Sequence, residues 1–146
     1  MNRVDEQSII ALRRITRALD VYSRTLLREH HLTAPQLALL QEVERCGPAP
    51  IGSLAKAAYL GAPTATGIAD RLEKQGLVAR VRTESDRRQV LITITAAGKQ
   101  LLRRNPPSSS AGFHDQLRRL SKAEQQKVCD VLQQVAEMME NAVERE

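Results

Sequence analysis

Four arginines gathered in one short stretch are the residues of this sequence whose spacing best suits a chemical task. The stretch spans nine positions and contains Arg80, Arg82, Arg87 and Arg88. A guanidinium group stays charged at physiological pH and binds phosphate through paired hydrogen bonds. We therefore expect this stretch to contact a polyanion. The alternative is an ordinary exposed turn, in which such arginines form surface ion pairs of little energetic value.

The charge distribution agrees with a polyanion-binding module in the middle of the chain. Residues 51–100 hold 8 basic and 4 acidic side chains, whereas residues 1–50 hold 7 and 6, and residues 101–146 hold 7 and 7. Nearly all of the formal net charge of +5 therefore lies in the middle third. Aromatic residues make up only 2% of the chain, which favours an aliphatic, helical core and argues against base stacking on single-stranded nucleic acid.

Residues that support catalysis or metal binding form no recognisable motif. The sequence lacks a nucleophile elbow, a phosphate-binding loop, a His-Glu-x-x-His pair and clustered Cys/His ligands, and two of its three histidines are adjacent. We predict that the protein is not an enzyme and that it uses no cofactor and no metal. Cys46 and Cys129 match no metal or redox spacing, so we interpret them as small core residues, with a thiol switch as the alternative.

The apolar runs and the start of the chain favour a soluble protein. No apolar run reaches the roughly 18 residues of a membrane span, and no secretory signal opens the sequence. We expect a cytoplasmic protein without a membrane partner. A chain of 146 residues with 42% hydrophobic side chains suits one compact protomer.

Helix and strand patterns indicate the elements that position the arginines. Capping signals and apolar spacing predict three helices, over about 33–46, 51–58 and 62–75. Two β-branched, alternating stretches follow, over 77–82 and 89–95. A short helix, a turn, a second helix and a hairpin form a winged helix-turn-helix, whose wing would present Arg87 and Arg88 at its tip.

Long amphipathic helices are predicted at both ends of the chain. One runs over about 7–30, and the other follows a capping box formed by Ser121 and Glu124. Both carry a narrow apolar stripe, which we expect to pack across a two-fold axis in an obligate homodimer; folding back onto the chain's own module is the alternative. The stripe residues assigned to dimerisation are Leu12, Ile15, Leu19, Val128, Val131, Val135 and Met138.

The order of these motifs resembles the MarR family of winged helix-turn-helix transcriptional regulators. The most specific stretches are Arg71-Leu72-Glu73-Lys74-Gln75-Gly76-Leu77-Val78, Asp86-Arg87-Arg88 and Thr95-Ala96-Ala97-Gly98. The resemblance covers nearly the whole chain and implies a mainly α fold with a small β-hairpin wing. It divides the chain into an N-terminal dimerisation helix over 1–32, a winged helix-turn-helix DNA-binding domain over 33–96 and C-terminal dimerisation helices over 97–146.

The resemblance implies that the helix over about 62–75 lies in the major groove of DNA. Pro63, Thr64, Thr66 and Gly67 occupy its N-terminal, outward side, where side chains reach base edges, and Arg71 would contact a phosphate. Plain solvent exposure is the alternative for the two threonines. Many members carry Arg where Gly67 stands, so we expect thinner base readout here and more reliance on DNA shape.

The same resemblance assigns DNA contacts to the wing. We expect Asp86 to accept hydrogen bonds from Arg88 or from turn amides and so to hold the hairpin tip. Arg87 or Arg88 would enter the minor groove, where narrow A·T tracts concentrate negative potential. Arg80 and Arg82, on the adjacent strand, complete the predicted DNA-binding set.

Two further expectations concern the rest of the chain. Pro106-Pro107 departs from the family pattern and should break a helix that is often one long rod, leaving a short helix around Phe113. Family members often sense small anionic aromatic molecules in a cleft between dimer core and wing module. Arg17, Tyr22 and Tyr59 are the candidates to line such a cleft in this chain.

Charge, motifs and resemblance together predict a dimeric regulator that binds specific double-stranded DNA. We expect a repressor that occupies a near-palindromic operator and is released by a small-molecule ligand that favours the non-binding state. The alternative is a winged-helix protein–protein adaptor without specific DNA binding. Such an adaptor would have no need to concentrate positive charge in the wing module.

Overall fold

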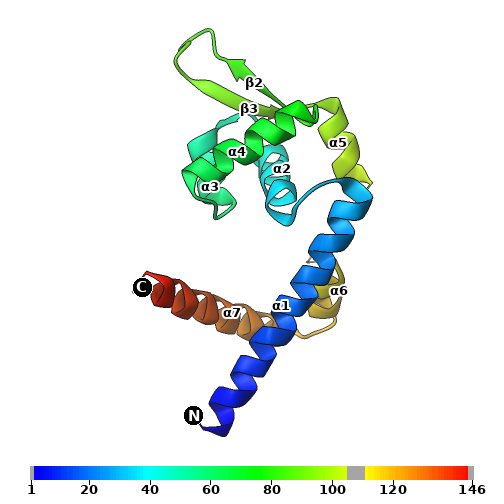
Figure 1. The fold of residues 1–146 in the computed structure, drawn as a ribbon, viewed down its shortest axis with the longest axis vertical. Coiled ribbons are helices and arrows are strands. Elements are labelled where there is room, and N and C mark those ends of the chain that lie inside the picture. The colour runs from blue at the N-terminus through cyan, green and yellow to red at the C-terminus, as the bar shows by residue number, and fades with distance from the viewer. Residues whose placement is uncertain (1, 105–110, 145–146) are drawn as a thin grey trace. The chain divides into compact units, whose positions relative to one another are not determined.

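The computed structural model describes residues 2–104 and 111–144, which form two compact units (Figure 1). The first unit, Met1–Ser109, contains helices α1 to α5 and three strands, and the second, Ser110–Glu146, contains α6 and α7. The predicted fold, mainly α-helical with a small β-hairpin wing, is confirmed. The predicted division at residues 32 and 96 follows roles rather than contacts and stays a prediction.

Helix α1 (Arg3–His30) is the long N-terminal helix that its apolar spacing predicts, but it begins earlier than residue 7. Its start depends on a capping box. The side chain of Asn2 accepts hydrogen bonds from the amides of Val4 and Asp5, and the Asp5 carboxylate accepts one from the Asn2 amide. Of the whole helix only Leu26 is buried, so its apolar stripe is largely exposed on this chain.

Helices α2 (Ala34–Cys46), α3 (Ile51–Ala57) and α4 (Ala62–Lys74) form the predicted helix-turn-helix module. The predicted capping box of α2 is present, with the Gln36 amide donating to Thr33 Oγ1 at 3.3 Å and the Thr33 amide to Gln36 Oε1 at 2.9 Å. Helices α2, α3 and α4 pack against one another over an aliphatic core. Its largest fully buried side chains are Leu26, Leu32, Leu37, Leu39, Leu40, Leu54, Leu72, Ile92 and Val43.

A three-stranded antiparallel sheet of order β1-β3-β2 flanks these helices. The wing strands β2 (Val78–Arg82) and β3 (Val90–Ile94) lie within the predicted stretches, and Arg82 pairs with Val90 next to the loop that joins the two strands. The third strand, β1 (Ala49–Pro50), was not predicted. A strand of two residues is too short to show an alternating pattern. Its pairing with Leu91 and Ile92 is a long-range contact that the local sequence does not encode.

Thr95 and Gly98 join the wing to helix α5 (Ala96–Arg103). Thr95 Oγ1 donates to the Gly76 carbonyl at 2.6 Å and accepts from the Gly98 amide at 3.1 Å, so one hydroxyl ties the end of α4 to the start of α5. Gly98 is buried, and a Cβ there would overlap the Leu77 carbonyl oxygen and lie 2.7 Å from Ile94 Cγ1. This glycine therefore permits the close approach of α5 to the sheet.

Helices α3 and α4 end in the same hydrogen-bonded turn, but with different residues at its left-handed position. After α4 the position is Gly76, with φ of 72°, and the amides of Gly76 and Leu77 donate to carbonyls of the last turn. After α3 it is Tyr59, with φ of 54°, and the amides of Tyr59 and Leu60 make the equivalent bonds. Glycine is the usual residue at this position, because a Cβ there costs about 1–2 kcal/mol.

The second unit consists of α6 (Ala111–Arg118) and α7 (Lys122–Val143). The predicted capping box of α7 is present, with Ser121 and Glu124 each accepting the other's amide hydrogen. A short helix around Phe113 is confirmed, whereas the predicted break at Pro106-Pro107 lies outside the described residues. None of the helices formed by the described residues is long and apolar enough to span a membrane.

The interpretation of Cys46 and Cys129 as core residues is wrong, because both are exposed. Cys46 is the final residue of α2 and lies one turn beyond Val43, where the buried face of that helix ends. Cys129 lies on α7, which has no buried side chain. A small apolar residue on a helix is buried only if its face is covered, and neither face is covered on this chain.

Candidate nucleic-acid interface

Helix α4 presents a buried face to the core and an open face of small residues to solvent. Ala65, Ile68, Ala69 and Leu72 are buried, as the helical period of the sequence predicts. The residues predicted to reach bases are all exposed: Pro63, Thr64, Thr66 and Gly67. A Cβ on Gly67 would meet nothing within 4 Å, so this chain's own packing does not require glycine there. An open, small-residue face allows another molecule to approach the helix backbone closely.

Thr66 differs from Thr64 in how its hydroxyl is used. Thr66 Oγ1 donates to the Ala62 carbonyl at 3.0 Å, one helical turn back, which leaves the hydroxyl oxygen as an acceptor. Thr64 has no such bond among the described residues and keeps both hydrogen-bonding roles.

Arg80 is already engaged within the fold. Its guanidinium lies 2.5 Å from Asp70 Oδ1 and 3.1 Å from Glu73 Oε1, both on α4. Partial burial would lower the pKa of Arg80, but the hydrogen bonds and charges of the two carboxylates outweigh it and raise that pKa. The pairing fastens β2 to α4, and the single positive charge of Arg80 offsets part of the negative charge of the two carboxylates.

The wing tip is held by the side chain predicted to hold it. Asp86 Oδ1 accepts a hydrogen bond from the Arg88 backbone amide at 3.0 Å, and Thr83 Oγ1 donates to the Asp86 carbonyl at 2.9 Å. Arg82 lies at the base of the loop, where its guanidinium donates to the Arg87 carbonyl at 2.8 Å. Asp86 and Arg82 therefore shape the loop.

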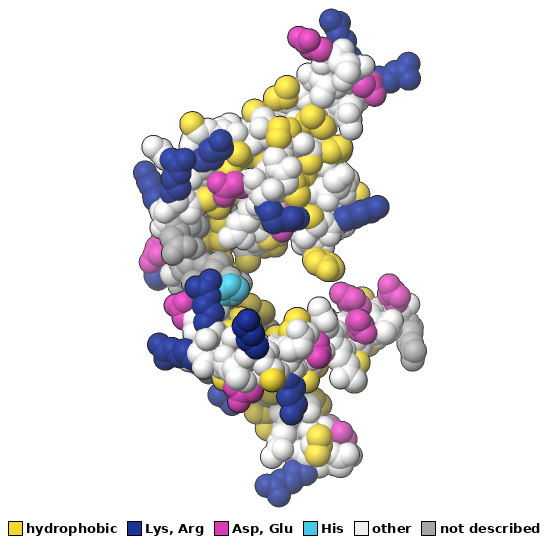
Figure 2. Space-filling view, turned by 180° about the vertical axis from the view of Figure 1, so that it is seen from behind, with side chains coloured by type: hydrophobic (Ala, Val, Ile, Leu, Met, Phe, Trp, Pro, Cys, Tyr) yellow, Lys and Arg dark blue, Asp and Glu magenta, His cyan; other side chains and the backbone are white. Residues whose placement is uncertain are grey.

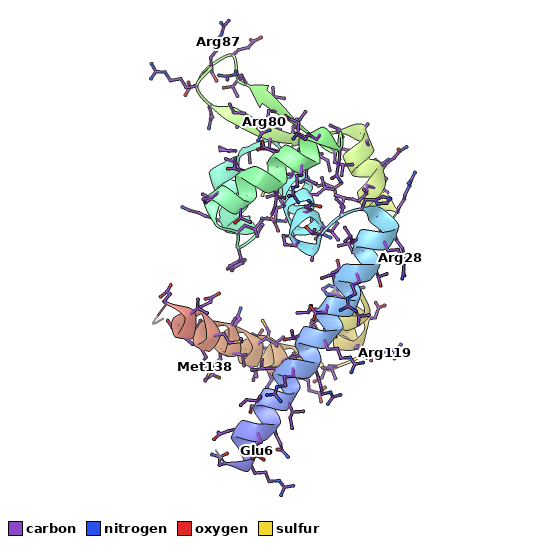
Figure 3. The ribbon with its side chains drawn as sticks, in the orientation of Figure 1. Glu6, Arg28, Arg80, Arg87, Arg119 and Met138 are labelled. Carbon is purple, nitrogen blue, oxygen red and sulfur yellow. The ribbon has the colours of Figure 1, made fainter. Side chains whose placement is uncertain are left out.

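The side chains of Arg87 and Arg88 are the exposed cations of the wing tip. Both residues are exposed, and neither guanidinium has an ion pair among the described residues. Figure 3 shows Arg87 pointing outward from the hairpin tip, and Figure 2 shows Lys and Arg side chains projecting there beside acidic ones. The arrangement leaves two guanidinium groups able to bind phosphate or to enter a narrow groove.

Arg71 is exposed near the C-terminal end of α4 and borders a hollow of about 330 Å³ in the first unit. The hollow is open to solvent, and its lining carries two cationic side chains and no carboxylate. The lining residues are Leu27, His31, Thr33, Gln36, Arg71, Lys74 and Gln75. Such a lining suits an anion.

The three residues predicted to line an effector cleft are not brought together in either pocket that the structure describes. Arg17 is exposed in the middle of α1, and Tyr22 is half-buried against the leucine core. Tyr59 lies in the turn between α3 and α4 and is 92% exposed. Their role as a ligand site stays a prediction. Among the described residues, no group of three His, Cys, Asp or Glu side chains could hold a metal ion.

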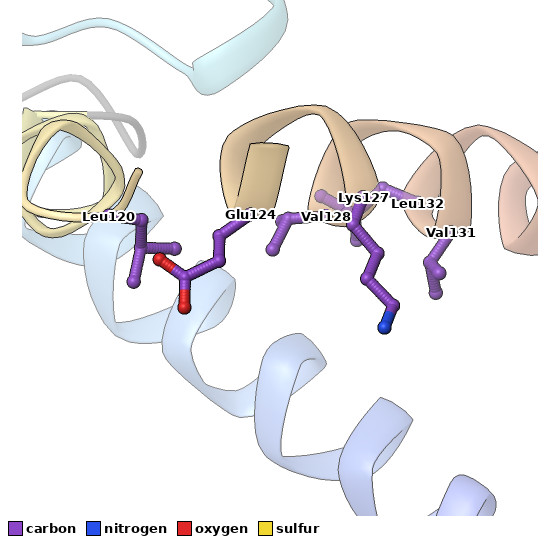
Figure 4. Close-up of a pocket in the computed structure, with 6 residues that line it drawn as sticks. All are labelled: Leu120, Glu124, Lys127, Val128, Val131 and Leu132. Carbon is purple, nitrogen blue, oxygen red and sulfur yellow. The ribbon is translucent and has the colours of Figure 1, made fainter. Parts of the chain in front are cut away.

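The predicted dimerisation residues lie on apolar stripes that remain largely open to solvent. On α1, Ile15 is 48% and Leu19 is 47% exposed, while Leu12 is half-buried. On α7, Val131 and Met138 are exposed, and Val128 and Val135 are half-buried. Val128 and Val131 line an apolar groove of about 510 Å³ along α7, together with Leu120, Glu124, Lys127 and Leu132 (Figure 4).

Sequence reasoning missed three features of this region. The pairing of Arg80 with Asp70 and Glu73 was hidden because it joins a strand to a helix ten and seven residues earlier. The tight packing at Gly98 has a signal in the Thr-x-x-Gly motif, but the motif does not tell which atoms the glycine approaches. The left-handed turn at Tyr59 had none, because aromatic residues rarely occupy that conformation.

Comparison with known proteins identifies the group to which this architecture belongs. A profile of the MarR family matches residues 32–90, which include the helix-turn-helix and the wing tip. The HTH-type regulator YxaD of Bacillus subtilis is 31% identical over 108 residues, which is 74% of this chain and 76% of that protein. The homoprotocatechuate degradative operon repressor of Escherichia coli is 32% identical over 95 residues, 65% of this chain and 64% of the repressor.

Another curated relative is matched over a smaller share of its length, and further matches come from solved structures. The match with YsmB of Bacillus subtilis, 34% identical over 92 residues, likewise spans less than two thirds, 63%, of the length of that regulator. Among solved structures, Bordetella bronchiseptica BpsR, whose DNA binding is regulated by 6-hydroxynicotinic acid, is 26% identical with a TM-score of 0.73. That likeness covers 93% of this chain and 97% of BpsR. The chain therefore belongs to the MarR family, and it is a transcriptional regulator rather than an enzyme.

Proposed function

We propose that this regulator binds specific double-stranded DNA as a homodimer and represses transcription from a near-palindromic operator. The observation that carries the proposal is the pairing of two exposed surfaces in one unit. These are the open N-terminal face of α4 and the guanidinium groups of Arg87 and Arg88 at the wing tip, which form no ion pair with the residues that the structure describes. DNA is reached in the cytoplasm, where we propose that the protein acts.

In this proposal α4 enters the major groove and the wing enters the adjacent minor groove. Pro63, Thr64, Thr66 and Gly67 face the base edges, where hydroxyl groups read donors or acceptors and methyl groups meet thymine. Arg87 and Arg88 seek the negative potential of a narrow minor groove. Arg71 contacts a phosphate, while Arg80, Arg82 and Asp86 act chiefly by holding the wing and α4 in register.

The homodimer is supported by what the chain leaves uncovered. Helix α7 has no buried residue, and its apolar stripe continues into an open groove. Exposed stripes of this length are uncommon on soluble monomers, and a two-fold axis would cover both copies at once. Two helix-turn-helix modules related by that axis would read an inverted repeat with half-sites about one helical turn apart.

Repression and its release by a ligand are supported by the relatives. One relative is a repressor of a degradative operon, and BpsR responds to an aromatic acid. The cationic hollow beside Arg71 and Lys74 is the described pocket that best fits a small carboxylate. A ligand that binds only the non-binding arrangement of the two modules would release DNA through its difference in affinity for the two states.

The experiment that tests the proposal is selection of the full-length protein on randomised duplex DNA, with sequencing of the bound fraction. We expect an enriched inverted repeat whose half-sites lie about one helical turn apart. Loss of all retention at moderate salt with no enriched sequence would contradict the proposal. The winged-helix adaptor, which binds protein rather than specific DNA, would then account for the fold. The selected duplex also serves to screen aromatic acids for release, with 6-hydroxynicotinate as the first probe.

A further inference from the structure

Tyr59 combines two features that folding alone does not explain. Its backbone has φ of 54°, in the left-handed region that disfavours a side chain, and its side chain is 92% exposed. Burial of the side chain therefore does little to offset the backbone strain. Its hydroxyl also has no hydrogen-bond partner among the described residues. A large aromatic side chain held open to solvent by a strained turn points to a contact made outside the folded chain.

The first unit contains a second turn of the same kind, with the usual glycine at the left-handed position. After α4, Gly76 occupies the equivalent position with φ of 72°, and the two amide-to-carbonyl bonds of the turn match those at Tyr59. At Tyr59 the Leu60 amide donates to the Ala55 carbonyl at 2.8 Å, and at Gly76 the Leu77 amide donates to the Leu72 carbonyl at 2.9 Å. The turn therefore forms with glycine, and a side chain at Tyr59 is not needed to close it.

The sequence on either side of Tyr59 favours a polyanion as its partner. Tyr59 lies two residues before Gly61, which is the N-cap of α4. It is therefore close to the N-terminal end of α4, where Pro63 and Thr64 lie. The sequence holds no Asp or Glu between Glu44 and Asp70, while Lys56 is exposed in the preceding helix. Tyr59 is thus the large side chain at the edge of an acid-free surface of small residues.

We infer that Tyr59 contacts the DNA backbone at the edge of the groove that α4 enters, an inference that rests on the proposed function. Its ring packs on a deoxyribose, and its hydroxyl donates a hydrogen bond to the neighbouring phosphate. The ring is exposed and its backbone belongs to the turn that precedes α4, so the contact would fix how α4 sits along the duplex. Phosphate and sugar contacts of this kind set register rather than sequence preference.

The test uses three variants of the full-length protein on its selected duplex. Tyr59→Gly relieves the backbone strain and removes the side chain, so we expect a higher melting temperature together with weaker DNA binding. Tyr59→Asn, which tolerates the left-handed region, controls for the added flexibility of glycine and should give the same pair of changes. Tyr59→Phe keeps the ring and the strain and should weaken binding by about fivefold, the effect of losing one hydrogen bond.

Salt dependence and the wild-type protein separate this inference from the proposed function. Because tyrosine is neutral, the slope of log Kd against log salt should stay at the wild-type value in all three variants. Unchanged affinity in Tyr59→Gly and Tyr59→Asn, on a duplex that the wild-type protein binds, would overturn this inference alone. Wild-type affinity in Tyr59→Phe would overturn the hydroxyl–phosphate contact. A wild-type protein that binds no duplex would overturn the proposed function, and this inference with it.

Discussion

Single side chains of the wing divide between holding the loop and facing outward. The side chains of Asp86 and Arg82 form hydrogen bonds with the backbone of the tip, whereas the guanidinium groups of Arg87 and Arg88 are exposed to solvent. Arginines at nearby positions therefore have different roles, since Arg82 holds the loop and Arg87 and Arg88 face solvent. Removing a loop-holding group should disorder the tip, and removing an open guanidinium should change only what the tip binds.

Replacing Arg88 by alanine should weaken DNA binding without affecting the fold. The backbone amide that bonds Asp86 remains, so we expect unchanged stability but an affinity about tenfold lower and a flatter slope of log Kd against log salt. Fluorescence anisotropy over a salt series measures both. Arg13→Ala, which removes the same charge from the exposed middle of α1, is the matched control. Equal affinity and slope in the two variants would remove the wing from the interface.

Replacing Gly98 by alanine should destabilise the first unit by about 1–3 kcal/mol, the usual effect of overpacking. The added Cβ overlaps a backbone oxygen of Leu77, which cannot swing aside as a side-chain end can. Gly52→Ala on α3 is the matched control, since a Cβ there meets nothing within 4 Å and helix propensity favours alanine. Urea unfolding measures both variants, and a neutral Gly98→Ala would show that α5 is free to shift.

At the scale of elements, the register between β2 and α4 depends on one strand residue and two helix residues. Arg80→Ala should cost about 0.5–1 kcal/mol, because all three side chains are partly exposed and solvent screens the pair. It should also weaken DNA binding, since two uncompensated carboxylates would face the phosphates. Adding Asp70→Asn to Arg80→Ala should restore part of the affinity in a double-mutant cycle. Additive effects on affinity would contradict this coupling.

The start of α7 should be sensitive to acid through its capping box. The backbone amide of Ser121, with its side chain, lowers the pKa of Glu124 below the ordinary value of about 4.5. Because the pKa is lower in the folded state, the ionised carboxylate stabilises the helix at pH values above the ordinary pKa. This stabilisation is lost as the pH falls through the lowered pKa. Glu124→Gln keeps the shape and an acceptor oxygen, so its stability deficit should shrink between about pH 6 and about pH 3. Urea unfolding followed by circular dichroism checks this, and a deficit independent of pH would refute it.

At the scale of the whole molecule, the exposed apolar stripes predict that the chain functions as a pair. Val131→Glu places a charge in the groove of α7 and should dissociate the dimer, from twice the chain mass of 16.2 kDa to one chain mass in light scattering. Gln133→Glu adds the same charge to the opposite face of α7 and should leave the dimer intact. Monomeric wild-type protein, or equal behaviour of the two variants, would contradict the dimer.

The sequence by itself determined the features that depend on neighbours in the chain. Helix ends at Thr33, Thr95 and Ser121 follow from side chains that bond amides two or three residues away, and the wing loop follows from Asp86 in the same way. The buried face of α4 follows from helical spacing. Such interactions are local, so a linear pattern contains the information for them.

The tertiary structure alone decided the features that need distant partners. Arg80 binds the acids of α4 instead of standing free, β1 pairs with β3 across some forty residues, and Gly98 meets the Leu77 carbonyl. Cys46 and Cys129 are exposed for the same reason, since burial depends on whether another element covers a face. Periodicity tells which side of a helix is apolar, but only the packing of the chain, or of two chains, decides whether that side is buried.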